Sequence, residues 1–119
     1  MEIDVHGGKG TVTDGVRRQT QSKVAKLERL APLLERAEVR LSEDLEAPLA
    51  GRHVCDVTVE GHGHVLRARA RARDLPMAVD LVVAKLHHQA ERLKGKLVGR
   101  SHPRRSKDLT KPESEASTA

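Results

Sequence analysis

The chain has 119 residues, of which 37% are hydrophobic, 33% are charged and none is Phe, Trp or Tyr. This length fits one small globular domain with a tail and excludes a second full domain. The 22 Lys and Arg residues exceed the 17 Asp and Glu residues, and the net charge of +5 favours an anionic partner. No apolar run approaches the ~18 residues of a membrane span, and no secretion or transit signal opens the chain, so we expect a cytoplasmic protein without membrane contact.

Positive charge is concentrated in the second half of the chain. Residues 64–107 contain 12 basic and 3 acidic residues, whereas residues 1–63 contain 9 and 11. Residues 99–119 offer almost no apolar side chain to bury, which predicts a disordered tail that is basic at first and acidic at its end. We therefore expect the folded domain to comprise residues 1–98.

The first half of this domain reads as a strand, a helix and a second strand. Apolar residues alternate with charged ones over residues 2–6, which predicts a strand that ends in a glycine-rich loop. Thr13 can cap a helix whose apolar stripe continues to Ala31, before Pro32 stops the pattern. Alternation resumes over residues 37–42, and the acidic segment that follows is predicted to be a loop.

The second half reads as a hairpin followed by a long helix. Residues 55–60 and 66–73 both alternate, and the glycine-rich turn at residues 61–63 joins them. Asp74 can cap a helix in which apolar residues recur at helical spacing as far as Leu97. The order β-α-β-β-β-α, with every strand apolar on one face, predicts a two-layer α+β domain. In this domain a four-stranded sheet has two helices packed on one face and solvent on the other.

One flank of the last helix carries a row of basic residues. At 100° per residue, the row comprises Lys85, His88, Arg92 and Lys96. The acidic residues of this helix lie on its other side. Such a row suits a surface that follows phosphates, because each neutralised phosphate releases counterions. An ordinary solvated helix face carries charge in the same way and is the more common case, so the residues alone leave both interpretations open.

Four arginines alternate along the last predicted strand and share one of its faces. They are Arg67, Arg69, Arg71 and Arg73. Acidic residues on the preceding strand can pair with two of them. The arginines either keep an open sheet face soluble or contact RNA. Because only histidine is available for stacking on bases, any RNA recognition is expected to read shape and phosphate geometry rather than sequence.

The seven histidines and the single cysteine give no specific sign of a metal or catalytic site. His62 and His64 flank a turn without a nearby cysteine, and the neighbours His87 and His88 do not share a helix face. Cys55 lies on the apolar face of its strand and reads as a small buried hydrophobe. We therefore predict no enzyme, no catalytic residue, no metal, no cofactor and no small-molecule substrate.

Six short stretches carry a resemblance to known proteins. They are VTD at 12–14, KVAKLE at 23–28, HVLRA at 64–68, DLPMAVDL at 74–81, KLHHQ at 85–89 and RLKGKL at 92–97. In this order and spacing they resemble the ribosome hibernation promoting factor family, which includes the stationary-phase ribosome-associated inhibitor. The resemblance implies a fold akin to the double-stranded RNA-binding domain. It also implies a stress-response protein that binds the small ribosomal subunit in the decoding cleft, where messenger and transfer RNA lie, and sterically blocks translation.

Carried over by position, the resemblance implies nine candidate rRNA-binding residues. They are Lys23, Lys26, Arg29, Lys85, His88, Gln89, Arg92, Lys94 and Lys96. The sequence departs from the family pattern at His88 and Glu91, where basic or neutral residues are usual, and at Thr20, where the first helix usually has an aromatic residue.

The resemblance is to the short members of the family, which lack the second domain that pairs ribosomes. We accordingly expect a monomer that does not pair ribosomes by itself. Two other functions stay open: a regulator that binds an acidic protein partner, and a general module for structured RNA.

Overall fold

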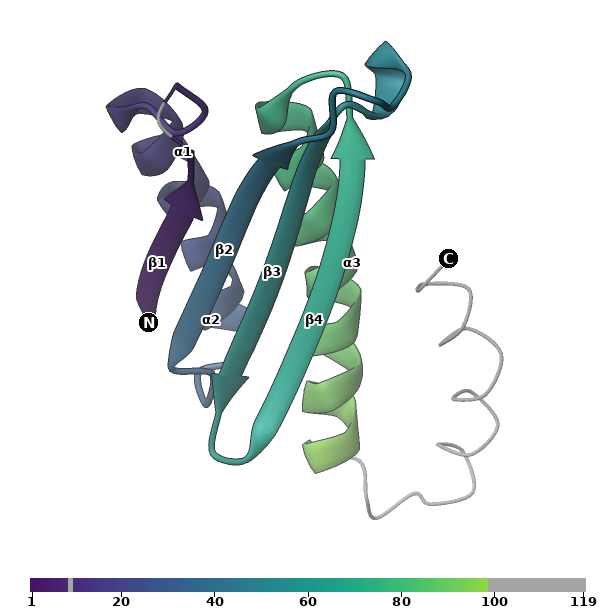
Figure 1. The fold of residues 1–119 in the computed structure, drawn as a ribbon. Coiled ribbons are helices and arrows are strands. Elements are labelled where there is room, and N and C mark those ends of the chain that lie inside the picture. The colour runs from purple at the N-terminus through teal and green to yellow at the C-terminus, as the bar shows by residue number, and fades with distance from the viewer. Residues whose placement is uncertain (9, 99–119) are drawn as a thin grey trace.

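The computed structural model describes residues 1–8 and 10–98, so the predicted tail at 99–119 lies outside the described residues. A single sheet is covered on one face by the helices (Figure 1). In chain order the elements are β1 (Glu2–Gly7), α1 (Asp14–Ala25), α2 (Leu27–Leu30), β2 (Arg36–Glu43), the 3-10 helix η1 (Leu49–Gly51), β3 (His53–Gly61), β4 (His64–Ala72) and α3 (Leu75–Val98).

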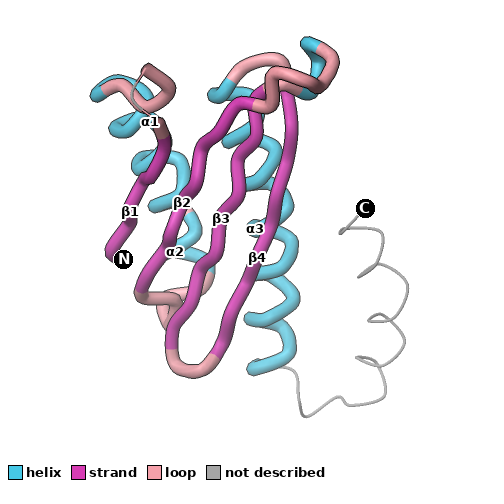
Figure 2. Tube along the Cα trace, in the orientation of Figure 1, coloured by secondary structure: helices cyan, strands magenta, loops and turns pink. Residues whose placement is uncertain are grey.

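The strands lie in the order β1-β2-β3-β4, and the sheet is mixed. β1 runs parallel to β2, whereas β2–β3 and β3–β4 are antiparallel. A parallel neighbour requires a crossover connection, which α1 and α2 supply on the covered face. The predicted α+β class is therefore confirmed, with four strands and the two main helices, α1 and α3, on the same side of the sheet (Figure 2).

Both predicted helix caps are present, but the first helix is shorter than expected. Thr13 Oγ1 accepts a hydrogen bond from Val16 N at 3.2 Å, and Asp74 Oδ1 accepts one from Met77 N at 2.8 Å. The prediction of one continuous helix to Ala31 is wrong, because α1 ends at Ala25 and the separate α2 follows. The backbone tightens there through a bond from the amide of residue 26 to the carbonyl of residue 23.

The core lies between the sheet and the helices and is built from small apolar side chains. Val39 and Val57 from the central strands pack in one buried cluster with Leu27 of α2 and Leu86 of α3, and each is 1% exposed or less. Thr20 of α1 is also buried. The opposite sheet face is open to solvent, so the charged residues that alternate with this core remain available to partners.

The β3–β4 hairpin turns through two residues with positive φ, His62 at 50° and Gly63 at 82°. Such angles match the twist of adjacent strands in a tight hairpin. A side chain at Gly61 would collide with the backbone of Leu33, so this strand end must carry glycine. The hairpin pairs β4 with β3 alone, so β4 and its arginines form the outer strand of the sheet.

Candidate nucleic-acid interface

The long helix α3 packs against β3 and β4 on the covered face, and side chains from one of its flanks are hydrogen bonded to the backbone of β4. Lys85 Nζ donates to the carbonyl oxygen of Arg69 at 2.9 Å. The Gln89 side chain binds both backbone groups of Arg67: Nε2 donates to the carbonyl oxygen at 2.9 Å, and Oε1 accepts from the amide at 3.2 Å. Lys85 and Gln89 are four residues apart and therefore share one flank of the helix. This side of α3, comprising Lys85, Gln89 and Arg92, is called the β4-side flank below.

The cations of the β4-side flank keep their charge available to a partner. The ion pairs that α3 makes among the described residues are Lys23–Asp80 at 2.7 Å and His87–Glu91 at 3.7 Å, and both lie on its other side. His88 is exposed next to the flank, and Arg92 is half-buried. The backbone of Lys96 belongs to α3, but its side chain lies outside the described residues.

The remaining candidates form a second group on the side of α3 that faces α1 and α2. Lys23 is bound to Asp80 in the seam between α1 and α3, and only 22% of its side chain is exposed. Lys26 and Arg29 are exposed where α1 meets α2, and Lys94 is exposed on α3. The nine predicted residues therefore do not form one patch. The β4-side flank is the better anion site, because the second group lies among acidic residues.

The arginines of β4 form a row on the open face of the sheet. This row, comprising Arg67, Arg69 and Arg71, is called the arginine row below. Arg69 Nε lies 3.7 Å from Asp56 of β3, a cross-strand pair that the hairpin register predicts. Arg71 pairs instead with Asp44 of the β2–β3 loop, at 3.2 Å. Of the two cross-strand pairs that the sequence allows, the structure shows one, Arg69–Asp56, and the second paired arginine, Arg71, takes a loop carboxylate instead.

Arg67 and Arg73 differ from these two because no carboxylate partner is found for them within residues 1–8 and 10–98. Arg67 Nε donates to the hydroxyl of Thr58 at 3.3 Å. Arg73 follows the end of β4 and is exposed.

The arginine row and the β4-side flank meet at the edge of β4, which the sequence reasoning missed. The ammonium group of Lys85 lies against the backbone of Arg69, so positive charge continues from the helical layer around the strand edge to the open face. The available signal was the four-residue spacing of Lys85 and Gln89 in the helix that follows β4. That spacing does not reveal which strand edge the helix covers.

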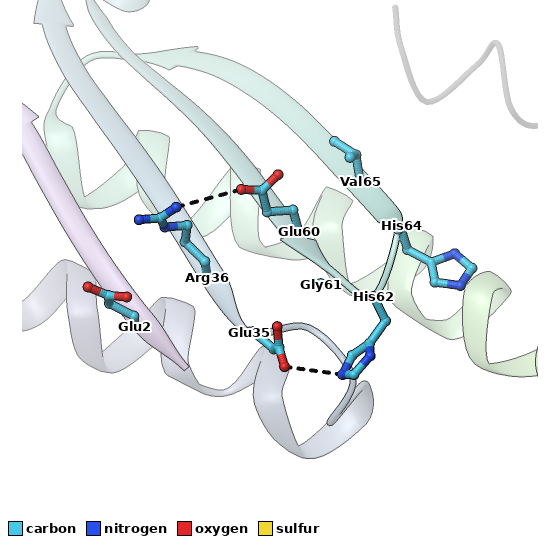
Figure 3. A pocket seen from close by; sticks show the side chains of 9 residues that line it. Glu2, Glu35, Arg36, Glu60, Gly61, His62, His64 and Val65 are labelled. Atoms are coloured by element: carbon cyan, nitrogen blue, oxygen red, sulfur yellow. Dashed lines mark ion pairs between the residues drawn. The ribbon is translucent and has the colours of Figure 1, made fainter.

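A pocket at the hairpin end of the sheet has different chemistry (Figure 3). Three of its lining residues are Glu2, Glu35 and Glu60, and ion pairs join Arg36 to Glu60 at 4.0 Å and His62 to Glu35 at 3.1 Å. Its carboxylates disfavour a phosphate ligand. Across residues 1–8 and 10–98, no group of three or more His, Cys, Asp or Glu side chains is placed to hold a metal ion.

Cys55 is fully buried in β3. Burial, reinforced by the neighbouring negative charge of Asp56, raises the pKa of the Cys55 thiol to about 12. The thiol therefore stays protonated at neutral pH, as suits a core residue. In the described ranges, no helix is both long and apolar enough to cross a bilayer.

The fold and this interface define a small α+β domain with a cationic sheet edge. The chain belongs to the Sigma 54 modulation protein / S30EA ribosomal protein family, whose model matches residues 3–98. It is 30% identical to the crystallised N-terminal domain of Thermus thermophilus Protein Y, with a TM-score of 0.63, over 78% of this chain and 99% of that one. A ribosomal subunit interface protein from Coxiella burnetii has the same fold, with a TM-score of 0.66 at 22% identity, over 81% of this chain and 100% of that one.

Two longer proteins contain a region that is similar in sequence to this domain. A ribosome hibernation promotion factor from Picosynechococcus sp. is 28% identical over 101 residues, which are 84% of this chain and 52% of that protein. One from Staphylococcus aureus is 27% identical over 109 residues, which are 92% of this chain and 56% of that protein. The chain thus spans about half the length of these relatives.

Proposed function

We propose that this chain is a ribosome hibernation factor that binds the small ribosomal subunit in the cytoplasm and inhibits translation. The observation that carries the proposal is the β4-side flank, where Lys85 and Arg92 stand on a rigid helix without a carboxylate partner among the described residues. Membership of the family and the names of its longer relatives supply the ribosome as partner.

The proposed mechanism is steric and not enzymatic. Residues 1–98 act as a basic wedge in the decoding cleft and occupy the path of messenger and transfer RNA. Many cation–phosphate contacts hold the wedge, and each adds affinity through counterion release. The domain resembles the double-stranded RNA-binding domain in recognising backbone shape, which requires no aromatic residue. No covalent bond is made or broken, so the mechanism needs no catalytic group, metal or cofactor.

The nine candidate residues take different parts in this mechanism. Lys85, His88 and Arg92, followed by Lys96 one turn later, supply the main phosphate contacts. Both polar atoms of the Gln89 amide are bound to β4, so Gln89 positions the helix rather than binding RNA. The second group contacts a neighbouring RNA segment more weakly and comprises Lys23, Lys26, Arg29 and Lys94.

Co-sedimentation with purified small subunits tests the proposal. We expect binding at about 50 mM salt that weakens by about 10³ to 10⁵ at about 200 mM, as for ~6 to 10 phosphate contacts. The variant Lys85→Glu/Arg92→Glu/Lys96→Glu should remain folded by circular dichroism but lose binding. A wild-type chain that does not co-sediment even at low salt contradicts the proposal.

A double variant separates charge from structure, because Lys85 also holds the edge of β4. Arg92→Glu/Lys96→Glu leaves that bond in place and should weaken binding about 60-fold at ~0.1 M salt, the effect of two lost phosphate contacts. The matched control is Arg36→Glu/Arg40→Glu, which changes the net charge equally on β2. If both double variants lost the same affinity for small subunits, the interaction would depend on net charge and not on the β4-side flank.

Two further measurements distinguish the other functions considered for this chain. Equal affinity for small subunits and for arbitrary RNA duplexes would assign a general structured-RNA module. A partner that remains bound after nuclease treatment would assign a regulator of an acidic protein. Either result would replace the ribosome as the specific target.

A further inference from the structure

We propose that the arginine row is a separate binding site for one strand of RNA, which it holds by the phosphates. The row lies on the open face of the sheet, whereas the proposed function rests on the helical layer. The inference therefore goes beyond the proposed function and adds a second RNA surface to the domain. Four structural features support it: the spacing, the acidic border, the availability and the surroundings of the arginines.

The spacing of the row fits a nucleic-acid strand. Every second side chain of a β-strand points to the same face, so Arg67, Arg69 and Arg71 leave the backbone about 6.7 Å apart. Successive phosphates of an extended nucleic-acid strand are similarly spaced. A guanidinium group can bind two phosphate oxygens through parallel N–H donors. A strand laid along β4 would therefore meet about one arginine per nucleotide.

The arginine row is bordered on the same face by acidic side chains of β3, which favours a single RNA strand over a duplex. Adjacent strands lie about 4.8 Å apart, and β3 places Asp56 and Glu60 beside the row on the same face. Beyond β3, the same face carries Arg36, Glu38 and Arg40 of β2 and then Glu2 and Asp4 of β1. A duplex lying flat on the sheet would bring its second phosphate backbone past the row and over this mixed surface, where the carboxylates repel phosphates.

The arginines are ordered across the sheet and yet remain available. The Arg69–Asp56 pair is long, at 3.7 Å, and 61% of the Arg69 side chain is exposed. Arg71 Nη1 binds Asp44 and the carbonyl oxygen of Gly51, both at 3.2 Å, with 44% of the side chain exposed, and within residues 1–8 and 10–98 the Arg67 guanidinium binds the neutral hydroxyl of Thr58. Such solvated pairs contribute little, so a phosphate can replace the carboxylates without a large cost.

The surroundings favour RNA over the chain's own acidic end as the occupant. Val65 is 60% exposed on the same face as the row and gives an unstacked base some apolar surface to lie on. The terminal segment 108–119 has only three acidic residues, Asp108, Glu113 and Glu115, and Lys111 lies among them, so it offers the row fewer negative charges than an RNA strand with one phosphate per nucleotide. The sugar-phosphate backbone of RNA carries its phosphates at intervals close to the spacing of the arginines. The site would bind RNA without reading its sequence.

Fluorescence anisotropy of the full chain with a labelled oligouridylate of about 12 nucleotides tests the site. In Arg67→Gln/Arg69→Gln we expect the slope of log affinity against log salt to decrease by about 1.4, which is about 25-fold in affinity at ~0.1 M salt. The matched control is Arg36→Gln/Arg40→Gln. It removes the same charge from the same face and breaks pairs of similar length, Arg36–Glu60 at 4.0 Å and Arg40–Glu38 at 3.8 Å.

Three outcomes would overturn the inference. The first is unchanged oligonucleotide binding in Arg67→Gln/Arg69→Gln or an equal loss in the control. The second is a duplex of the same length that binds more tightly than the single strand and depends on the same arginines. The third is binding that appears only after residues 108–119 are deleted, which would make the acidic segment the occupant.

The test is independent of the proposed function. Arg92→Glu/Lys96→Glu should weaken binding to small subunits about 60-fold at ~0.1 M salt and leave the contribution of Arg67 and Arg69 to oligouridylate binding unchanged. If the wild-type chain fails to co-sediment with small subunits, the proposed function fails and the arginine site still stands. If the arginine variant binds oligouridylate normally, the arginine site fails and the proposed function still stands.

Discussion

At both outer edges of the sheet, two helix side chains bind the backbone of the edge strand, but the charge around the two edges differs. At β1, Arg17 of α1 donates to the carbonyl oxygen of Val5 at 2.9 Å, and Gln21 donates to that of Ile3 at 3.4 Å. At β4, α3 supplies a lysine and a glutamine with the same four-residue spacing. Each helix thus covers backbone groups that would otherwise be open to another strand.

The difference between the edges lies in what surrounds the closing residues. The open face of β1 carries Glu2 and Asp4, so the cation that closes this edge is offset by nearby acids. At β4 the closing lysine adjoins the arginine row. At each edge, one cationic side chain and one glutamine bind the open backbone groups. The arginine row and Arg92 at β4 are additional cations that this closure does not use. We infer that the excess charge at β4 serves a partner.

The largest expected effect concerns Cys55, whose strand lies between β2 and β4. Its pKa is raised from 9.0 to about 12, which lowers the thiolate fraction at pH 8 by about 10³ relative to the unfolded chain. Alkylation of the native protein by iodoacetamide should therefore be at least that much slower than alkylation in urea, as mass spectrometry can measure. Comparable rates would show that the native thiol is neither buried nor protonated.

The same labelling reaction compares how readily the two edges open. Gln89→Leu removes two hydrogen bonds from β4 and should speed Cys55 labelling about tenfold, since local opening costs about 1.4 kcal/mol less. Gln21→Leu removes one long bond from β1, which is not adjacent to the cysteine strand. It should leave the labelling rate unchanged. Equal acceleration in both variants would mean that the chain opens as one unit.

The free energy of unfolding should also fall more in Gln89→Leu than in Gln21→Leu, but the two variants should differ less than in their labelling rates. Urea unfolding of Gln89→Leu should show a loss of about 1 to 2 kcal/mol, because two backbone groups of Arg67 lose their partner. Gln21→Leu should lose about 0.5 kcal/mol, since its bond is long. A larger loss in Gln21→Leu would reverse the inferred order of the two edges.

Most of the fold was predictable from local pattern. Alternation marks all four strands, and the oxygen atoms of Thr13 and Asp74 mark two helix starts. The break at Lys26 was not predictable, because the apolar stripe continues through it. The short helix η1 was expected to be a loop. The parallel pairing of β1 with β2 was also hidden, since alternation is the same for both strand directions.

The candidate site was less accessible to sequence reasoning than the fold. Helical spacing correctly placed Lys85 and Arg92 apart from Asp80 and Glu91. It could not show that Gln89 binds a strand backbone or that Arg71 pairs with a loop carboxylate. These contacts join residues that are 22 and 27 positions apart in the chain. Only the tertiary fold sets such distances.

The smallest expected effect concerns α1, the helix that closes the β1 edge. Lys23 is a candidate rRNA contact, yet its ammonium group lies 2.7 Å from Asp80, a carboxylate whose side chain is 62% exposed. Asp80→Asn should free Lys23 and raise the affinity for small subunits about threefold, a fraction of one full phosphate contact. Stability should change by less than about 0.5 kcal/mol, because the Asp80 carboxylate is largely solvated and an ion pair with a solvated partner contributes little.

The matched control for this last effect is Glu91→Gln, which removes one negative charge from the same side of α3. Glu91 is paired with His87 at 3.7 Å and touches no candidate cation in that pair. A threefold gain restricted to Asp80→Asn would assign Lys23 to the RNA surface. Equal gains in affinity in both variants would result from the more positive electrostatic potential around α3. The RNA contacts would then be confined to the β4 side of the domain.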